Sequence, residues 1–160
     1  MKRSEIIEGL KKYFAAHELV DKQTYTAFGD ESWQFFDTDT LHTLLVLREG
    51  IDKPFDINNW FWGGNYDERG LRTNLSDIVK GKNKKNSLYL SGHVLGKAFD
   101  FKVKGMDSED VRKWIQAHES KLPCKIRLEH IMNSTGKPIT WVHFDTKWET
   151  KNPTVYLFNV

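Results

Sequence analysis

The sequence predicts an α+β domain in which N-terminal helices pack on a central antiparallel β-sheet. Apolar residues recur every three to four positions in two segments of the first 50 residues, which is helical spacing. Four later segments show strand-like alternation or many β-branched and aromatic residues: 98–105, 124–131, 139–145 and 154–160. The chain has 160 residues, of which 39% are hydrophobic and 29% charged, so we expect one globular domain over residues 1–160.

The helices are predicted from their caps and apolar stripes. Ser4 can cap a first helix whose stripe ends at Phe14. The acidic turn 37–40 precedes a second helix, which carries four leucines and ends at Gly50. A third helix is expected to begin near residues 107–108.

Two stretches between these helices lack a regular period. Residues 54–74 contain Gly63-Gly64 and Gly70, which indicate tight turns that can position side chains. Residues 80–85, KGKNKK, hold four lysines and predict a solvated surface loop rather than a phosphate-binding patch.

Alternation in the predicted strands separates core residues from polar ones. Phe99 and Phe101 are expected to face the core, which places Asp100 on the opposite face of its strand. In the segment WVHFD, the same period places His143 and Asp145 together on one face. We therefore expect Asp100 and His143 to meet in one groove.

His93 lies between two glycines just before the first of these strands, on a turn that can fold back over Asp100. Two neutral imidazoles, from His93 and His143, and one carboxylate leave the fourth position of a tetrahedral zinc ion open for water, as in catalytic zinc sites. The pKa of that water falls toward about 7. The spacing alone leaves open a simpler interpretation, in which His93 is a hydrogen-bonded turn residue and Asp100 a strand-edge residue without a metal.

A hydrolase also needs a base and a positive charge. Glu129 alternates out of phase with Ile126 and Leu128, which are expected to face the core, so its carboxylate is the best-placed base. Arg72 and Arg69 precede the metal motif and could stabilise a negative intermediate or grip a substrate carboxylate.

Overall composition argues against several other classes of protein. The formal net charge of +2 gives weak attraction to nucleic acid or anionic membranes, so neither is expected as a partner. Cys124 is the single cysteine and cannot form an internal disulfide. Charged residues interrupt the N-terminal segment MKRSEIIEGLKKYF, and we therefore expect neither a signal peptide nor a transmembrane helix.

These motifs resemble those of the M15 family of zinc D-alanyl-D-alanine carboxypeptidases and phage endolysin-like peptidases. SGHVLGKAFD is similar to the family signature S-x-H-x-x-G-x-A-x-D, WVHFD to the second metal-binding segment, and RGLRTN to a G-x-R turn. The resemblance runs from about Phe14 to Asp145 and implies the Hedgehog/D,D-peptidase fold. In many members a glutamate closely precedes the last histidine, whereas here the preceding residues ITWV contain none.

Residue by residue, the resemblance implies a zinc site and a set of roles around it. The zinc ligands would be His93, Asp100 and His143. Glu129 would be the general base, and Arg72 would bind substrate or stabilise the transition state. Ser91 would support the motif at the substrate site, where Arg69 and Trp141 are further candidates for substrate contacts; Trp60 and Trp62 are expected to pack in the core.

The function implied is hydrolysis of peptide bonds in peptidoglycan stem peptides, as a D,D-carboxypeptidase or an endolysin-type endopeptidase, with Zn²⁺ as cofactor. We expect a monomer, cytoplasmic at synthesis in a bacterial or phage-infected cell, that acts on the cell wall after release. Two alternatives stay open: a zinc protein without catalysis, and an aromatic-lined binder of carbohydrate or single-stranded nucleic acid, suggested by six tryptophans and the KGKNKK run.

Overall fold

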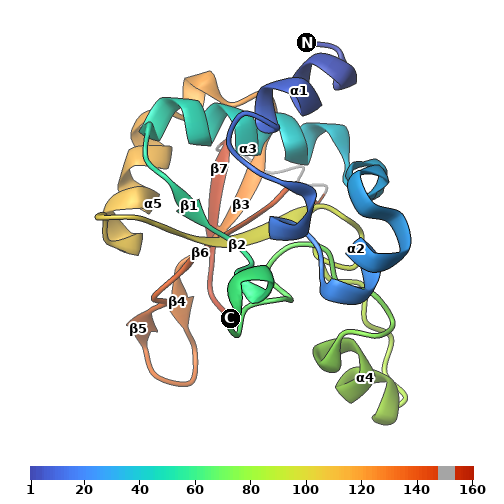
Figure 1. Ribbon diagram of the computed structural model, residues 1–160. Coiled ribbons are helices and arrows are strands. Elements are labelled where there is room, and N and C mark those ends of the chain that lie inside the picture. The colour runs from blue at the N-terminus through green and yellow to red at the C-terminus, as the bar shows by residue number, and fades with distance from the viewer. Residues whose placement is uncertain (148–153) are drawn as a thin grey trace.

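A mixed five-stranded sheet forms the centre of the computed structural model, which describes residues 1–147 and 154–160 (Figure 1). The strand order is β1-β2-β6-β3-β7, and a separate hairpin pairs β4 with β5. The strands of the sheet are β1 (Phe55–Asp56), β2 (Ala98–Val103), β3 (Ile126–Glu129), β6 (Val142–Asp145) and β7 (Val155–Phe158). The hairpin consists of β4 (Ile131–Met132) and β5 (Lys137–Pro138).

The α+β class is confirmed, but the expectation of an antiparallel sheet is wrong at one edge. Strands β1, β2, β6 and β3 pair antiparallel, whereas β7 pairs parallel to β3. The chain reverses direction after β6 and then places β7 on the far side of β3 rather than beside β6. Because β3 and β6 run in opposite directions, a strand that reverses from β6 must run parallel to β3.

Five α-helices lie in the part of the chain that the structure describes. They are α1 (Arg3–Leu10), α2 (Lys22–Phe28), α3 (Thr38–Ile51), α4 (Asp77–Lys84) and α5 (Ser108–Ala117). Short 3₁₀ turns join them: η1 (Ala16–Glu18), η2 (Gly29–Phe35), η3 (Trp60–Trp62) and η4 (Glu119–Lys121). Within the described ranges, none of the helices has the length and apolar character needed to cross a bilayer.

The predicted helices form, but the first ends at Leu10 and not at Phe14 as expected. The Asp37 carboxylate caps α3 by accepting hydrogen bonds from the backbone N–H groups of Asp39 (3.0 Å) and Thr40 (3.4 Å). Helix α1 begins two residues earlier than expected, with Lys2 rather than Ser4 at the N-cap, because Glu5 accepts a bond from the Lys2 backbone at 2.8 Å. The expectation of a loop at 80–85 is wrong for residues 80–84, which belong to α4. The expectation that this stretch is exposed to solvent is confirmed.

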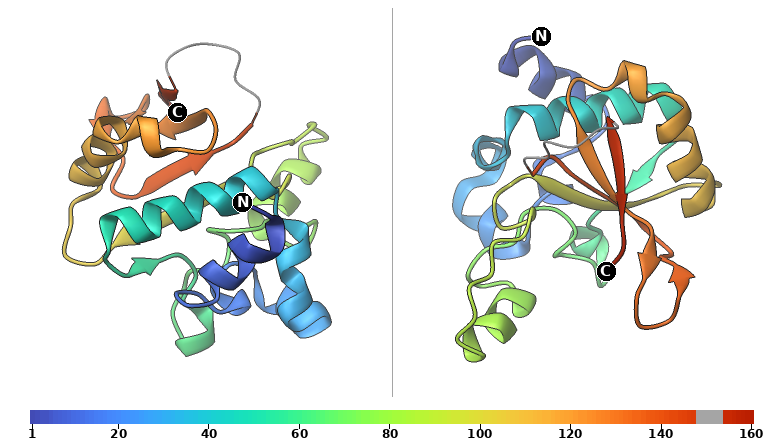
Figure 2. Two further views of the ribbon diagram at one scale, coloured as in Figure 1. Left: turned by 90° about the horizontal axis from the view of Figure 1, so that it is seen from above. Right: turned by 180° about the vertical axis from the view of Figure 1, so that it is seen from behind.

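Helix α3 runs across one face of the sheet, with α1 packed on its outer side, while α5 contacts β2 and β6 (Figure 2). The predicted core face is confirmed, because Phe99, Phe101 and Phe144 are fully buried. Phe36 stacks on Phe99 (ring centroids 5.0 Å apart), and Phe55 stacks on Phe101 (4.4 Å). This aromatic layer holds β2 and β6 in register and leaves their other face for polar residues.

Candidate metal centre

The register of β2 and β6 places two of the predicted ligands directly opposite each other. Asp100 pairs with His143, one position from the buried pair Phe99 and Phe144. Since side chains alternate along a strand, both polar groups project from the face opposite the aromatic core. The expectation that Asp100 and His143 share one groove is therefore confirmed.

His93 reaches these strands from the turn before β2. Gly96 adopts a φ of +65°, and a Cβ there would lie 2.1 Å from the Phe35 carbonyl oxygen, so only glycine fits this close approach. The Lys97 N–H then donates to the Gly92 carbonyl at 2.7 Å and closes the turn. The turn thus carries the His93 ring back over Asp100.

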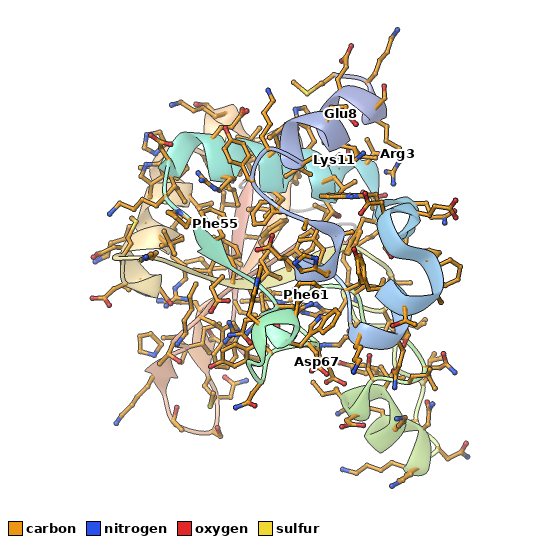
Figure 3. All side chains as sticks on the ribbon, viewed as in Figure 1. Arg3, Glu8, Lys11, Phe55, Phe61 and Asp67 are labelled. Atoms are coloured by element: carbon orange, nitrogen blue, oxygen red, sulfur yellow. The ribbon has the colours of Figure 1, made fainter. Side chains whose placement is uncertain are left out.

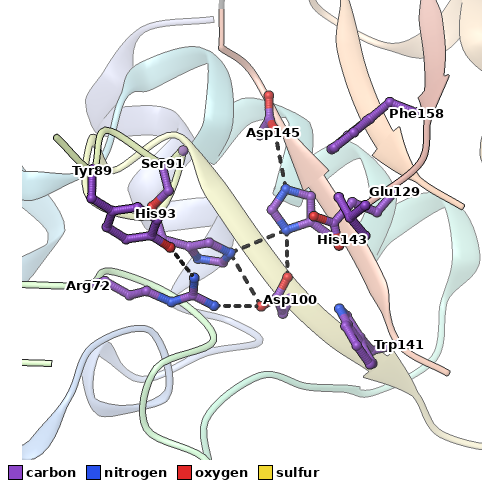
Figure 4. Close-up of a pocket in the computed structure, with 12 residues that line it drawn as sticks. Arg72, Tyr89, Ser91, His93, Asp100, Glu129, Trp141, His143, Asp145 and Phe158 are labelled. Carbon is purple, nitrogen blue, oxygen red and sulfur yellow. Dashed lines mark hydrogen bonds and ion pairs between the residues drawn. The ribbon is translucent and has the colours of Figure 1, made fainter. Parts of the chain in front are cut away.

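Three donor atoms converge at the base of this arrangement (Figure 4). His143 Nδ1 lies 2.6 Å from Asp100 Oδ1, and His93 Nε2 lies 3.3 Å from both Asp100 Oδ2 and His143 Nδ1. One ligand atom from each residue can be chosen so that all three lie within 4.8 Å of one another. The three side chains are buried and could hold a metal ion.

The far side of each imidazole is held by an acceptor, as metal-ligating histidines require. His93 Nδ1–H donates to the Gly70 carbonyl at 2.7 Å, which leaves Nε2 with its lone pair toward Asp100. His143 Nε2 faces Asp145 Oδ2 at 3.3 Å. Arg127 in turn grips Asp145 through two bonds of 2.8 and 2.7 Å.

The charges in the site are strongly coupled. Burial lowers the pKa of His93, so its imidazole is neutral at physiological pH. Burial alone would lower the pKa of His143 as well, but its bonds to Asp100 and Asp145 outweigh burial and raise it to about 10. Burial likewise opposes ionisation of Asp100, yet the two histidines hold its pKa well below the usual range. Without a metal, the site is an imidazolium held between two carboxylates.

A cavity of about 310 Å³ opens over these residues. Four of the other predicted site residues line it, namely Arg72, Glu129, Ser91 and Trp141. Tyr89, Asp145 and Phe158 also line the cavity, as Figure 4 shows. The structure therefore gathers residues from the loop before the metal motif and from β2, β3, β6 and β7.

Arg72 is held in place by backbone and side-chain acceptors. Its Nε donates to the Glu68 carbonyl at 2.8 Å, and its terminal nitrogens lie 3.3 Å from the Tyr89 hydroxyl and 3.2 Å from Asp100 Oδ2. The Arg72 guanidinium therefore lies in a fixed orientation in the wall of the pocket, where its positive charge can bind an anionic group.

Arg69 does not join the pocket walls, unlike the other predicted substrate contacts. Its guanidinium lies over the Tyr66 ring, 3.3 Å from the centroid, and 3.7 Å from the Asp56 carboxylate. Only its backbone serves the site, because its carbonyl accepts the Asp100 N–H at 2.7 Å. The structure thus places the Arg69 side chain away from this pocket, because the loop turns between Arg69 and Arg72 and directs their side chains to different places.

Glu129 and Trp141 complete the pocket from the sheet. Burial raises the pKa of Glu129, whose carboxylate shares the cavity with His143. The backbone carbonyl of Trp141 accepts a 2.9 Å bond from the buried Arg112 side chain, which fixes that wall against α5. His130, the neighbour of Glu129, does not line this pocket, and its Nε2 lies 3.5 Å from a Glu109 carboxylate oxygen.

Sequence reasoning did not single out Tyr89 and Arg127. Tyr89 stands two residues before Ser91, and this closeness to the metal motif is the one signal that could have marked it. Arg127 precedes Glu129 by two on the same strand, but its partner Asp145 becomes apparent only from strand pairing.

The assembled site could hold a metal ion and places a carboxylate and a guanidinium in the same pocket. A scan against protein-family models and comparisons with curated proteins and with solved structures found no match for this chain. Any proposal about function therefore depends on the chemistry of the site and on the motifs in the sequence.

Proposed function

We propose that this protein is a zinc metallopeptidase that hydrolyses peptide bonds in peptidoglycan stem peptides. The observation that carries the proposal is the convergence of His93, Asp100 and His143 beneath a pocket that also contains Glu129 and Arg72. Two imidazole nitrogens and one carboxylate match the donor set of catalytic zinc, and both imidazoles have the outer hydrogen bonds that such ligands need.

The fold proposed with this activity is the Hedgehog/D,D-peptidase arrangement, with residues 1–160 as one zinc peptidase domain. Helices on one face of a mixed sheet, and a turn histidine that leads into a strand aspartate, support this choice. The motif resemblance supplies the substrate class, namely peptides of the bacterial cell wall.

Zinc, when bound, would act as a Lewis acid that makes water a stronger nucleophile at neutral pH. The Glu129 carboxylate takes a proton from the attacking water and later donates it to the leaving amine. Burial raises the pKa of Glu129, which makes its carboxylate a stronger base toward the attacking water.

Arg72 supplies the positive charge of the reaction. Its bonds to Glu68 and Tyr89 orient the guanidinium before substrate arrives, so little reorganisation is needed to stabilise a developing oxyanion. The same group could instead hold the terminal carboxylate of a D-Ala-D-Ala peptide. A carboxypeptidase would therefore lose most activity on a substrate with an amidated C-terminus, whereas an endopeptidase would not.

The test begins with zinc per chain by elemental analysis, before and after a chelator, for the parent and for Asp100→Ala. The exposed Asp110→Ala on α5 is the matched control. We expect about one zinc in the parent and the control and little in Asp100→Ala.

The second step is turnover of purified peptidoglycan peptides, followed by chromatography and mass spectrometry. Release of D-alanine or cleavage of the stem, lost on chelation and restored by zinc, supports the proposal. Zinc binding without cleavage of any stem peptide would instead indicate a non-catalytic zinc protein, and failure to bind zinc would remove the hydrolase assignment.

A further inference from the structure

An unexplained group of exposed aromatic rings lies on η3, outside the pocket. Phe61 is 52% exposed and Trp62 64% exposed, although such rings are normally buried. The expectation that Trp60 and Trp62 pack in the core is therefore wrong, because no residue of η3 is buried. We call Phe61 and Trp62 the aromatic platform; Figure 3 labels Phe61 on this loop.

The aromatic platform is supported from beneath. The His17 ring stacks on Phe61 with centroids 4.0 Å apart and meets Trp62 edge-on at 5.1 Å. Trp60 anchors the turn by donating its indole N–H to the Val20 carbonyl at 2.8 Å. The Phe61 and Trp62 rings stand nearly perpendicular, with an interplanar angle of 83°, so each presents its own fixed face to a ligand at little entropic cost.

The surroundings of the aromatic platform select the kind of ligand. Residues 55–69 carry three acidic side chains, Asp56, Asp67 and Glu68, against the single basic Arg69, a net charge of −2. That charge opposes docking on an anionic lipid surface. Two rings, at about 150–250 Å² each, also fall short of the roughly 800 Å² that each partner buries in a stable protein interface. A neutral ligand with a flat apolar face and polar edges fits better.

The loop that bears the aromatic platform continues into the metal centre. Its Arg69 carbonyl accepts the Asp100 N–H, and its Gly70 carbonyl accepts the His93 Nδ1–H, both at 2.7 Å. The same short segment therefore carries the aromatic platform and two of the acceptors that position the candidate metal ligands. In peptidoglycan, the stem peptides are covalently attached to chains of N-acetylated aminosugars, so a glycan lies near any peptide in the pocket.

We propose that Phe61 and Trp62 form a second binding site that stacks against the pyranose faces of a neutral N-acetylaminosugar chain. The choice of this glycan rests on the proposed peptidase function. Stacking on the platform would hold the cell-wall glycan while its peptide is presented to the pocket, so the two sites would act on one polymer.

Binding is tested by titrating zinc-free protein with tetra-N-acetylchitotetraose, a glycan without peptide, by calorimetry. We expect saturable binding that weakens about tenfold or more in Trp62→Ala and in Phe61→Ala. The matched control is Phe28→Ala, which removes a ring of 45% exposure that packs against Phe35 instead. Unchanged melting temperatures show that each variant is folded.

Several outcomes would overturn the proposal. They are absence of binding to the tetrasaccharide, equal affinity in Trp62→Ala, binding to phosphatidylcholine vesicles in place of the glycan, or self-association that disappears in Trp62→Ala. Peptidase assays keep the two proposals separate. Trp62→Ala should retain cleavage of a free stem peptide while losing activity on intact cell walls, whereas His93→Ala should lose cleavage and retain glycan binding.

Discussion

Binding of zinc should expel about one proton from His143, and this proton makes the site's affinity for metal depend on pH. The pKa of His143 is raised from 6.5 to about 10 by Asp100 and Asp145, so its ring is an imidazolium at neutral pH. His93 is neutral and Asp100 ionised, so neither contributes a proton. A metal at His143 Nδ1 must displace the proton between that atom and Asp100.

The expected magnitude follows from that one proton. Below pH 10 the apparent association constant should rise about tenfold per pH unit, or about a hundredfold between pH 7 and pH 9. This change corresponds to about 2.7 kcal/mol of binding free energy. The Asp145→Asn variant removes one of the two carboxylates, so its His143 pKa should fall and its pH dependence should flatten.

The assay is competition for zinc with a chromophoric chelator of known pH dependence, together with calorimetry at pH 7.5 in buffers of different ionisation enthalpy. The buffers report the number of protons released for each zinc bound. Release of no proton at pH 7.5, or an affinity that stays constant from pH 7 to pH 9, would refute the imidazolium assignment and the ligand role of Nδ1.

Other changes give distinct outcomes. Glu129→Gln should keep one zinc per chain and lower kcat by about 10²–10⁴-fold in a stem-peptide assay, and full activity would place the base elsewhere. Arg72→Lys keeps the charge but not the planar fork, so kcat/KM should fall by about 10–100-fold with zinc content unchanged. Gly70→Ala should lower the free energy of unfolding by about 1–3 kcal/mol, because a Cβ there would lie 1.9 Å from the Leu19 carbonyl oxygen. The control Gly81→Ala meets nothing within 4 Å and lies in α4, so it should be neutral or stabilise by up to about 1 kcal/mol in denaturant titrations. In zinc-free protein, the stability due to the raised His143 pKa is complete below pH 6.5 and lost as pH rises toward about 10, so an equal pH dependence of the melting temperature in the parent and in His143→Gln would contradict the ion pair.

Much of the candidate site could be predicted from local pattern. Period-two alternation separated Asp100 from Phe99 and Phe101, and the same reasoning placed Glu129 opposite Leu128. These predictions succeed because the hydrophobic effect assigns one face of a strand to the core, whatever the partner strand is.

Predictions that depended on loop conformation were less successful. Arg69 and Arg72 stand in the same short segment, yet only Arg72 lines the pocket. Trp62 was expected inside and lies exposed. Composition cannot settle such cases, because a loop without a regular period gives no rule for which of its side chains face the protein.

The sequence by itself determined the α+β class, the two faces of the strands and the candidate ligands His93, Asp100 and His143. Only the tertiary structure decided that β7 runs parallel to β3, that Tyr89 joins the pocket, and that Arg127 holds Asp145 behind His143. The physical reason is the range of the interactions. Local periodicity records which side of an element is buried, whereas strand order and contacts between distant side chains emerge only when separate segments pack together.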